Sequence, residues 1–189
     1  MIPGIVYSAP ALAQEFGVSA TPVREAMVDL CSEGLVETVR NKGYRVTEVS
    51  DKDLDDITDL RLMIEPPAGR RAVAAATAED IAHLRELADR IVEAARGRDL
   101  IQYVDADRDF HLTLLGLCGN PQIVKTVAEL RAQTRLYGLS RLAQAGQLES
   151  SAAEHHTIVD HLAAGDGRGV EDVLARHIGH VRGKWAGQD

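Results

Sequence analysis

Apolar and polar residues alternate with helical spacing over most of this chain, and residues 35–49 are the main exception. The first helical stretch, "APALAQEF", lies between Ser8, a residue type that caps helices, and Gly17, a residue type that ends them. A second helix is expected from about Ala20 to Glu33. It follows Ser19 as a cap and stops at Gly34. Its apolar positions Val23, Ala26, Met27 and Leu30 share one face, which predicts a buried side.

Residues 35–49 have the two-residue period of strands. The segments "LVETV" and "YRVTEV" alternate apolar and polar positions, and Arg40-Asn41-Lys42-Gly43 joins them as a turn. The first fifty residues therefore predict a winged helix-turn-helix in which the first helix is apparently missing.

From Ser50 onward the period is helical almost throughout. One helix is expected from Ser50 until Pro66 and Pro67 break or kink it, and the pair Thr77 and Asp80 predicts a capping box at the start of the next. Further helices are expected at about 77–96, 100–118, 121–145, 151–164 and 168–185. The expected fold is mainly α. It combines a truncated winged helix-turn-helix over residues 1–50 with an antiparallel helical bundle over residues 51–189.

Composition indicates how the core is built and where the protein is located. The chain has 189 residues, a formal net charge of −8 and only 4% aromatic residues, so small aliphatic side chains must build its core. Its two cysteines, Cys31 and Cys118, lie in amphipathic segments, as buried free thiols do. No apolar run is long enough to span a bilayer, and the first residues do not have the pattern of a secretory signal. We therefore expect a cytoplasmic protein with no membrane partner.

The start of the second helix has the chemistry of a DNA reader. The N-terminal residues of the second helix of a helix-turn-helix face the major groove, and Ser19, Thr21 and Arg24 occupy those positions. Lys42 and Gly43, in the turn of the hairpin, would lie in a wing against the DNA backbone. The alternative is that Arg24 is a solvated helix residue near acidic neighbours.

A second group of residues has metal-ligand chemistry. Asp107 and His111 are four residues apart and share a helix face, while His155 and His177 lie on two later helices. Side chains from several helices can converge in a bundle core as metal ligands, and imidazole with carboxylate suits Zn, Ni, Mn or Fe. Spacing alone leaves open that these are hydrogen-bonded core histidines.

The segment "LAQEFGVSATPVREAMVDLCSEGLVETVRNKGYRVTEV" resembles the winged-helix domain of the GntR family of bacterial transcription regulators. The resemblance implies that Ser19, Thr21 and Arg24 contact operator DNA and that Gly43 lies at the wing tip. The chain departs from the family pattern at Ala20, where arginine is usual, and at Pro10, where a polar contact residue is usual.

The remainder resembles the FCD ligand-binding domain of the FadR-like branch of that family. The matching segments are "DLRLMIEPPA", "DRDFHLTLLGLCGN", "EHHTIVDHLAAGD" and "ARHIGH". The resemblance implies that Asp107, His111, His155 and His177 bind a divalent metal, and that a small organic or sugar acid is the effector. Arg61 would pair with the carboxylate of that acid; its alternative is an ion pair with Asp59 or Glu65.

These patterns together predict a ligand-responsive transcription regulator, a repressor that binds operator DNA as a homodimer and is not an enzyme. Two alternatives remain at the level of the sequence. One is a metalloenzyme acting on a carboxylate substrate, and the other is a regulator that senses the metal itself.

Overall fold

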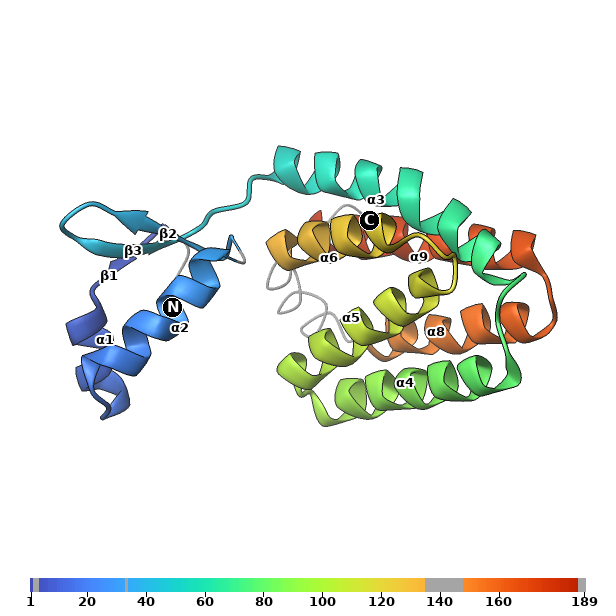
Figure 1. Ribbon diagram of the computed structural model, residues 1–189, viewed down its shortest axis with the longest axis horizontal. Helices are drawn as coiled ribbons and strands as arrows, with labels where there is room; N and C mark the ends of the chain where they lie inside the picture. Colours follow the sequence, from blue (N-terminus) through green and yellow to red (C-terminus); the bar gives the residue numbers. More distant parts are fainter. Residues whose placement is uncertain (2–3, 33, 135–147, 187–189) are drawn as a thin grey trace. The chain divides into compact units, whose positions relative to one another are not determined.

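A computed structural model describes residues 1, 4–32, 34–134 and 148–186, with side chains described up to residue 179. The chain divides into two compact units, residues 1–50 and residues 51–189 (Figure 1). The first contains β1 (Val6–Tyr7), α1 (Ala9–Phe16), α2 (Ala20–Ser32), β2 (Val36–Val39) and β3 (Gly43–Val46). The second is helical in its described part.

Local signals at the N-terminus produce the expected helices. The Ser8 hydroxyl accepts a hydrogen bond from the backbone N–H of Ala11, and Gly17 ends α1 in a left-handed conformation. Val23 and Met27 of α2 are buried against residues of α1 and β2, and Leu30 is partly buried. Ala26 is exposed, so the buried face of α2 is narrower than its apolar pattern predicted.

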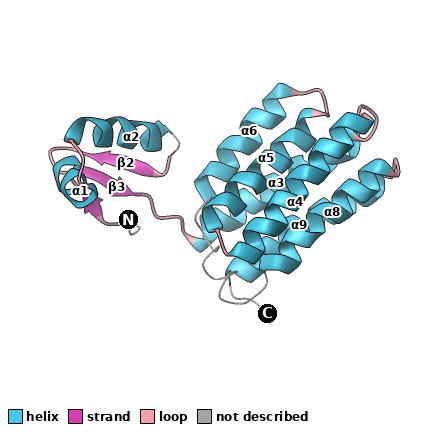
Figure 2. Cartoon of the chain, turned by 90° about the horizontal axis from the view of Figure 1, so that it is seen from below, coloured by secondary structure: helices cyan, strands magenta, loops and turns pink. Residues whose placement is uncertain are grey.

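The sheet has three strands rather than the predicted two. Its order is β1-β3-β2, and both pairings are antiparallel (Figure 2). The additional strand β1 contributes only Val6 and Tyr7, too short a segment to show a two-residue period. Glycine is required at position 43, where β3 begins beside β1. Its φ is 130°, and an added Cβ would lie 2.2 Å from the carbonyl oxygen of Tyr7.

The second unit is a bundle of packed helices. Its described helices are α3 (Asp51–Ala72), α4 (Ala78–Gly97), α5 (Leu100–Gly116), α6 (Pro121–Thr134), α8 (Leu148–Ala163) and α9 (Gly167–Ala186). Helix α3 packs on α9, α5 and α6, while α4 packs on α5 and α8 (Figures 1 and 2). Phe110, Leu114 and Ile158 are among the side chains buried at its centre. The predicted mainly α fold, a winged helix-turn-helix followed by a helical bundle, is confirmed.

Helix α3 does not end at its two prolines. It runs from Asp51 to Ala72 with Pro66 and Pro67 inside it, so of the expected break or kink the break is excluded. Each proline removes one backbone hydrogen bond, but the surrounding residues are held by packing. Gly69 lies so close to α9 that an added Cβ would be 2.3 Å from the Leu174 side chain. This close packing against α9 is a tertiary contact that stabilises α3, and the proline pattern alone does not predict it.

Other boundaries follow the sequence signals where the structure describes them. Thr77 and Asp80 form the predicted capping box of α4. Helix α6 is described to Thr134, so the rest of the helix expected up to residue 145 lies outside the described residues. None of the described helices combines the length and apolar character needed to cross a membrane.

Candidate metal centre

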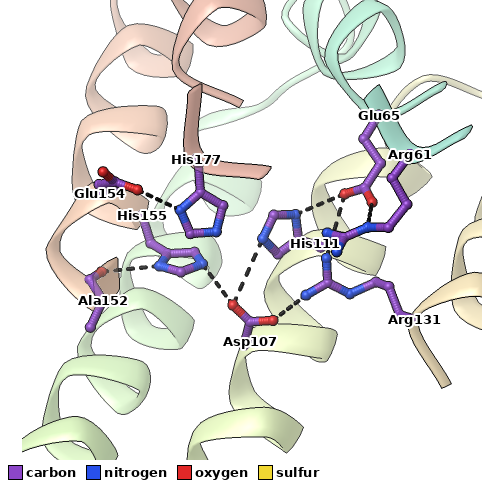
Figure 3. A network of polar contacts seen from close by, with 9 residues as sticks. All are labelled: Arg61, Glu65, Asp107, His111, Arg131, Ala152, Glu154, His155 and His177. Carbon is purple, nitrogen blue, oxygen red and sulfur yellow. Dashed lines mark hydrogen bonds and ion pairs between the residues drawn. The ribbon is translucent and has the colours of Figure 1, made fainter. Parts of the chain in front are cut away.

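Four side chains from three helices converge inside the bundle. Asp107 and His111 come from α5, His155 from α8 and His177 from α9 (Figure 3). One ligand atom from each can be chosen so that all four lie within 4.8 Å of one another. The structure therefore brings together all four residues that the sequence suggested as metal ligands.

The cluster is mostly buried, with Asp107 its partly exposed member. The residue exposures of His111 and His155 are 0%, that of His177 is 2%, and the Asp107 side chain is 17% exposed. Both ring nitrogens of His111 and Nε2 of His155 are buried without a well-aligned hydrogen bond, although Nε2 of His155 lies 3.1 Å from Oδ1 of Asp107. Buried nitrogen atoms that lack a partner are costly unless something binds them. The donor set of three imidazoles and one carboxylate fits a divalent transition metal.

Each histidine is held through the other ring nitrogen. Nδ1 of His177 is 2.7 Å from the Glu154 carboxylate, and Nδ1 of His155 is 3.0 Å from the carbonyl oxygen of Ala152. Nδ1 of His111 lies 3.1 Å from Oε2 of Glu65. Because carboxylates at neutral pH and carbonyl groups only accept hydrogen bonds, the neutral rings carry their proton on Nδ1. Nε2 is then the lone-pair atom, as a metal ligand requires.

Two arginines balance the acidic groups of the site. Arg131 contacts Oδ2 of Asp107 at hydrogen-bond range, and its Nη1 lies 3.5 Å from Oε2 of Glu65. Arg61 binds the other oxygen of Glu65, with 2.5 Å between Nε and Oε1. The two guanidinium groups and the two carboxylates of this network cancel in charge.

Electrostatics keep the two carboxylates charged and the imidazoles of His111 and His177 neutral. Burial alone would raise the pKa of Asp107, but Arg131 and the two histidines facing it hold that pKa well below its usual range. Burial likewise would raise the pKa of Glu65, but Arg61, His111 and Arg131 together lower it. Burial, assisted by Arg131, lowers the pKa of His111 to about 3, and burial also lowers the pKa of His177. Neutral imidazole with anionic carboxylate is the protonation state in which these groups bind metals.

Comparison with known proteins follows the same division of the chain. The FCD domain family matches residues 56–180, and the family of bacterial regulatory proteins named gntR matches residues 8–46. The chain belongs to the GntR family and carries an FCD domain. It is therefore a DNA-binding transcription regulator and not an enzyme.

Curated relatives of this GntR-family chain are also regulators. It is 29% identical over 175 residues to the HTH-type transcriptional regulator McbR of Escherichia coli. The aligned region covers 92% of this chain and 79% of McbR. It is 31% identical over 170 residues to a probable D-xylose utilization operon transcriptional repressor of Paenarthrobacter nicotinovorans, spanning 88% and 73% of the two chains. The Nta operon transcriptional regulator of Aminobacter aminovorans is 34% identical over 136 residues, 70% of this chain and 63% of the relative.

Solved structures agree with the fold. The structure of E. coli McbR/YncC has a TM-score of 0.78 and 28% identity, covering 95% of this chain and 86% of that one. A putative GntR regulator from Rhodococcus sp. RHA1 has a TM-score of 0.75 and 24% identity, covering 99% of this chain and 89% of that one.

The suggested DNA-contact residues of the GntR domain lie on its surface. Ser19 directly precedes α2, Thr21 and Arg24 lie in its first two turns, and all three are exposed. Lys42 is exposed in the turn between β2 and β3, and Gly43 is partly buried beside β1. These positions leave the side chains of Thr21, Arg24 and Lys42 free of the core.

Arg61 has the partner that the alternative interpretation named. It is 7% exposed and paired with Glu65 one helical turn later. Three other described histidines have acidic partners outside the cluster. His156 lies near Asp89, His161 near Asp166 and, more distantly, His83 near Glu86.

Sequence reasoning did not assign three residues of this site, Glu65, Arg131 and Glu154, to the metal centre. Glu65 carried a usable signal, because it lies four residues after Arg61 within the motif quoted for the FCD resemblance. Glu154 carried a similar signal, because it directly precedes His155 in another of the quoted segments. Arg131 carried none, since it reaches the cluster only through the packing of its helix.

Proposed function

We propose that this chain is a homodimeric repressor whose helical unit binds one divalent metal ion and a small organic or sugar acid. The acid binds beside the metal and releases the protein from its operator. The observation that carries the proposal is the cluster of Asp107 with three buried histidines, each turned by a partner on its Nδ1 atom. The metalloenzyme alternative is dropped, because the family and the curated relatives are regulators.

The donor set supports a metal with room for a further ligand. Four protein ligands leave one or two positions of a six-coordinate ion free, and a carboxylate oxygen is a suitable group to fill them. Zn, Ni, Mn and Fe all accept imidazole with carboxylate. His111, His155 and His177 would supply nitrogen and Asp107 would supply oxygen.

Charge supports an acidic effector. Arg61 and Arg131 are matched by Glu65 and Asp107, so a divalent ion adds two positive charges to a balanced and buried network. Glu154, beside His177, offsets one of them. The remaining positive charge favours an anion at this place, with the two guanidinium groups close enough in the network to assist.

The names of the relatives support regulation of an operon. One is named for a D-xylose utilization operon, another for the Nta operon, and a Haemophilus influenzae relative, 29% identical over 192 residues, is the Uxu operon regulator. The first of these relatives is named as a repressor, and its name is the basis for proposing repression here. None of these names fixes the acid for this chain.

DNA binding would use the exposed end of α2 and the wing. Arg24 has the reach and the planar donor geometry for a guanine edge or a phosphate, and Thr21 adds a hydroxyl donor. Lys42 would contact the backbone from the wing. A two-fold dimer presents two such heads to a palindromic operator.

The exposed face of α3 is the surface we propose for the second copy. Leu60 and Met63 are 46% and 71% exposed, although both are large apolar residues. Met63, Pro67 and Ile123 are among the residues that line a pocket of about 320 Å³ between α3 and α6. An exposed apolar face with an adjacent pocket is typical of a surface that another subunit covers.

Replacing Met63 with glutamate is therefore expected to produce monomers, because it places a charge in the proposed interface. Sedimentation velocity at micromolar protein measures this directly. Exposed Ile101 on α5, replaced by glutamate, is the matched control and should leave the dimer intact. A Met63→Glu protein that sediments as the wild type would contradict this surface.

A thermal-shift screen of organic and sugar acids tests the effector proposal. An acid at about 100 times its Kd stabilises the folded protein by about 2.7 kcal/mol, which is roughly 5–10 °C for a chain of this size. The shift is expected with Zn or Ni present and not after chelation. If no acid raises Tm further in the metal-loaded protein, the effector class is wrong.

A further inference from the structure

Glu65 occupies a special place in the network around the metal centre. Its side chain is completely buried in the middle of α3 and has three charged or polar neighbours (Figure 3). Nε of Arg61 is 2.5 Å from Oε1, while Nδ1 of His111 and Nη1 of Arg131 are 3.1 and 3.5 Å from Oε2. Helix α3 supplies none of the four clustered ligands.

The three histidine partners differ in the helix they come from. His155 is held by Ala152 of its own helix, and His177 is held by Glu154 of α8, which also supplies His155. Only His111 has its described Nδ1 partner, Glu65, on a helix outside the ligand set. That helix begins at Asp51, the residue that follows the DNA-binding unit in the chain.

Arg131 provides a second connection to the same carboxylate. Oδ1 of Asp107 faces the imidazoles, at 3.1 Å from Nε2 of His155 and 3.9 Å from Nε2 of His111. Oδ2 of Asp107 faces Arg131, and Arg131 also faces Glu65. Two of the four clustered side chains therefore depend on Glu65, His111 directly and Asp107 through one guanidinium group.

We propose that Glu65 is the positioning residue that sets His111 and Asp107 for metal binding and transmits occupancy of the site to α3. This inference rests on the proposed metal site. A carboxylate on Nδ1 fixes the ring orientation and makes Nε2 a better ligand, and loss of such a partner typically lowers metal affinity 10- to 100-fold. Because the carboxylate belongs to α3, ordering of His111 by a bound ion also orders the centre of α3.

A purely structural role for Glu65 is the competing explanation, in which it only neutralises Arg61. The two roles differ in what the metal does to the protein. A structural ion pair stabilises α3 equally with and without metal. A positioning residue makes the stability of α3 depend on the metal.

The test compares Glu65→Gln with Glu154→Gln, using Co²⁺ as the probe. Glu154→Gln is the matched control, because it removes the partner of His177 from α8 and leaves α3 untouched. Co²⁺ titrations followed by visible absorption give affinity and ligand geometry, and hydrogen exchange gives protection of residues 57–68 and 152–160. Asp59→Asn, an exposed change on the same helix, should behave as the wild type in both measurements.

In the wild type, Co²⁺ is expected to slow exchange in both segments. Both Gln variants should bind Co²⁺ about 10- to 100-fold more weakly. At saturating Co²⁺, Glu65→Gln should change the absorption spectrum and lose the protection of residues 57–68 but not that of residues 152–160. Glu154→Gln should keep the protection of residues 57–68. If Glu65→Gln binds Co²⁺ within threefold of the wild type, or keeps the protection at 57–68, the inference is overturned.

Two further outcomes are separated by the design. If Glu65→Gln does not fold, the double variant Arg61→Gln with Glu65→Gln removes both charges of the pair, and the same results are expected of it. If the wild type itself binds no Co²⁺, Zn or Ni, the proposed metal site fails and this inference fails with it. Wild-type binding together with an unaffected Glu65→Gln overturns the inference alone.

Discussion

Replacing Arg24 with alanine is expected to remove specific operator binding. Arg24 is exposed near the start of α2, where a guanidinium group can reach a guanine edge or a phosphate. A bidentate contact to a base is worth about 1–3 kcal/mol, and a dimer loses two of them. The expected loss is therefore about 2–6 kcal/mol, which is at least roughly 30-fold in affinity.

Fluorescence anisotropy with the DNA upstream of the gene measures this loss. Arg90→Ala removes an equal charge from an exposed position of α4 and is the matched control. Arg24→Lys keeps the charge but not the planar fork, so it should retain non-specific binding and lose sequence preference. Specific affinity of Arg24→Ala within threefold of the wild type would contradict a reading role for Arg24.

Replacing His111 with alanine is expected to remove the metal from the helical unit. His111 is completely buried, its Nδ1 lies 3.1 Å from Oε2 of Glu65, and its Nε2 has no hydrogen-bond partner within the described residues. Loss of a ligand should weaken metal binding by more than the roughly 10- to 100-fold typical of losing a partner of a ligand. The purified variant should contain no bound metal by elemental analysis, and added Zn or Ni should not raise its Tm.

The neighbouring histidine on α8 provides the control for His111. His156→Ala changes a partly exposed residue beside Asp89 and should leave metal content and the metal-induced rise in Tm unchanged. The rise in Tm is the relevant quantity, because an alanine at the buried position also lowers the stability of the metal-free protein. Full metal content in His111→Ala would exclude that residue as a ligand.

The sequence predicted those parts of the fold that depend on local signals. The cap at Ser8, the left-handed glycine at position 17 and the capping box at Thr77 each act within one turn of helix. Strand β1 and the continuation of α3 through Pro66 depend instead on contacts with distant segments. Those contacts have no counterpart in residue spacing, so the spacing predicts neither β1 nor the unbroken course of α3.

The metal centre, too, could be predicted from the sequence only in part. Asp107 and His111 share a helix face by spacing, but their meeting with His155 and His177 was expected from a family resemblance and appears only in the packed bundle. The partners of these ligands are less accessible still to sequence reasoning. Arg131 lies 24 residues from Asp107 in the chain and has no recognisable spacing to it. Its role follows from the packing of α6 on α5.

We propose above that an acid bound beside the metal controls DNA binding. The most direct test is a titration of operator DNA with metal-loaded wild-type protein, with and without a saturating acid from the thermal-shift screen. Allosteric coupling of about 1–3 kcal/mol predicts that the acid weakens operator affinity about 5- to 150-fold. Operator affinity that stays within twofold when the acid is saturating would contradict the account.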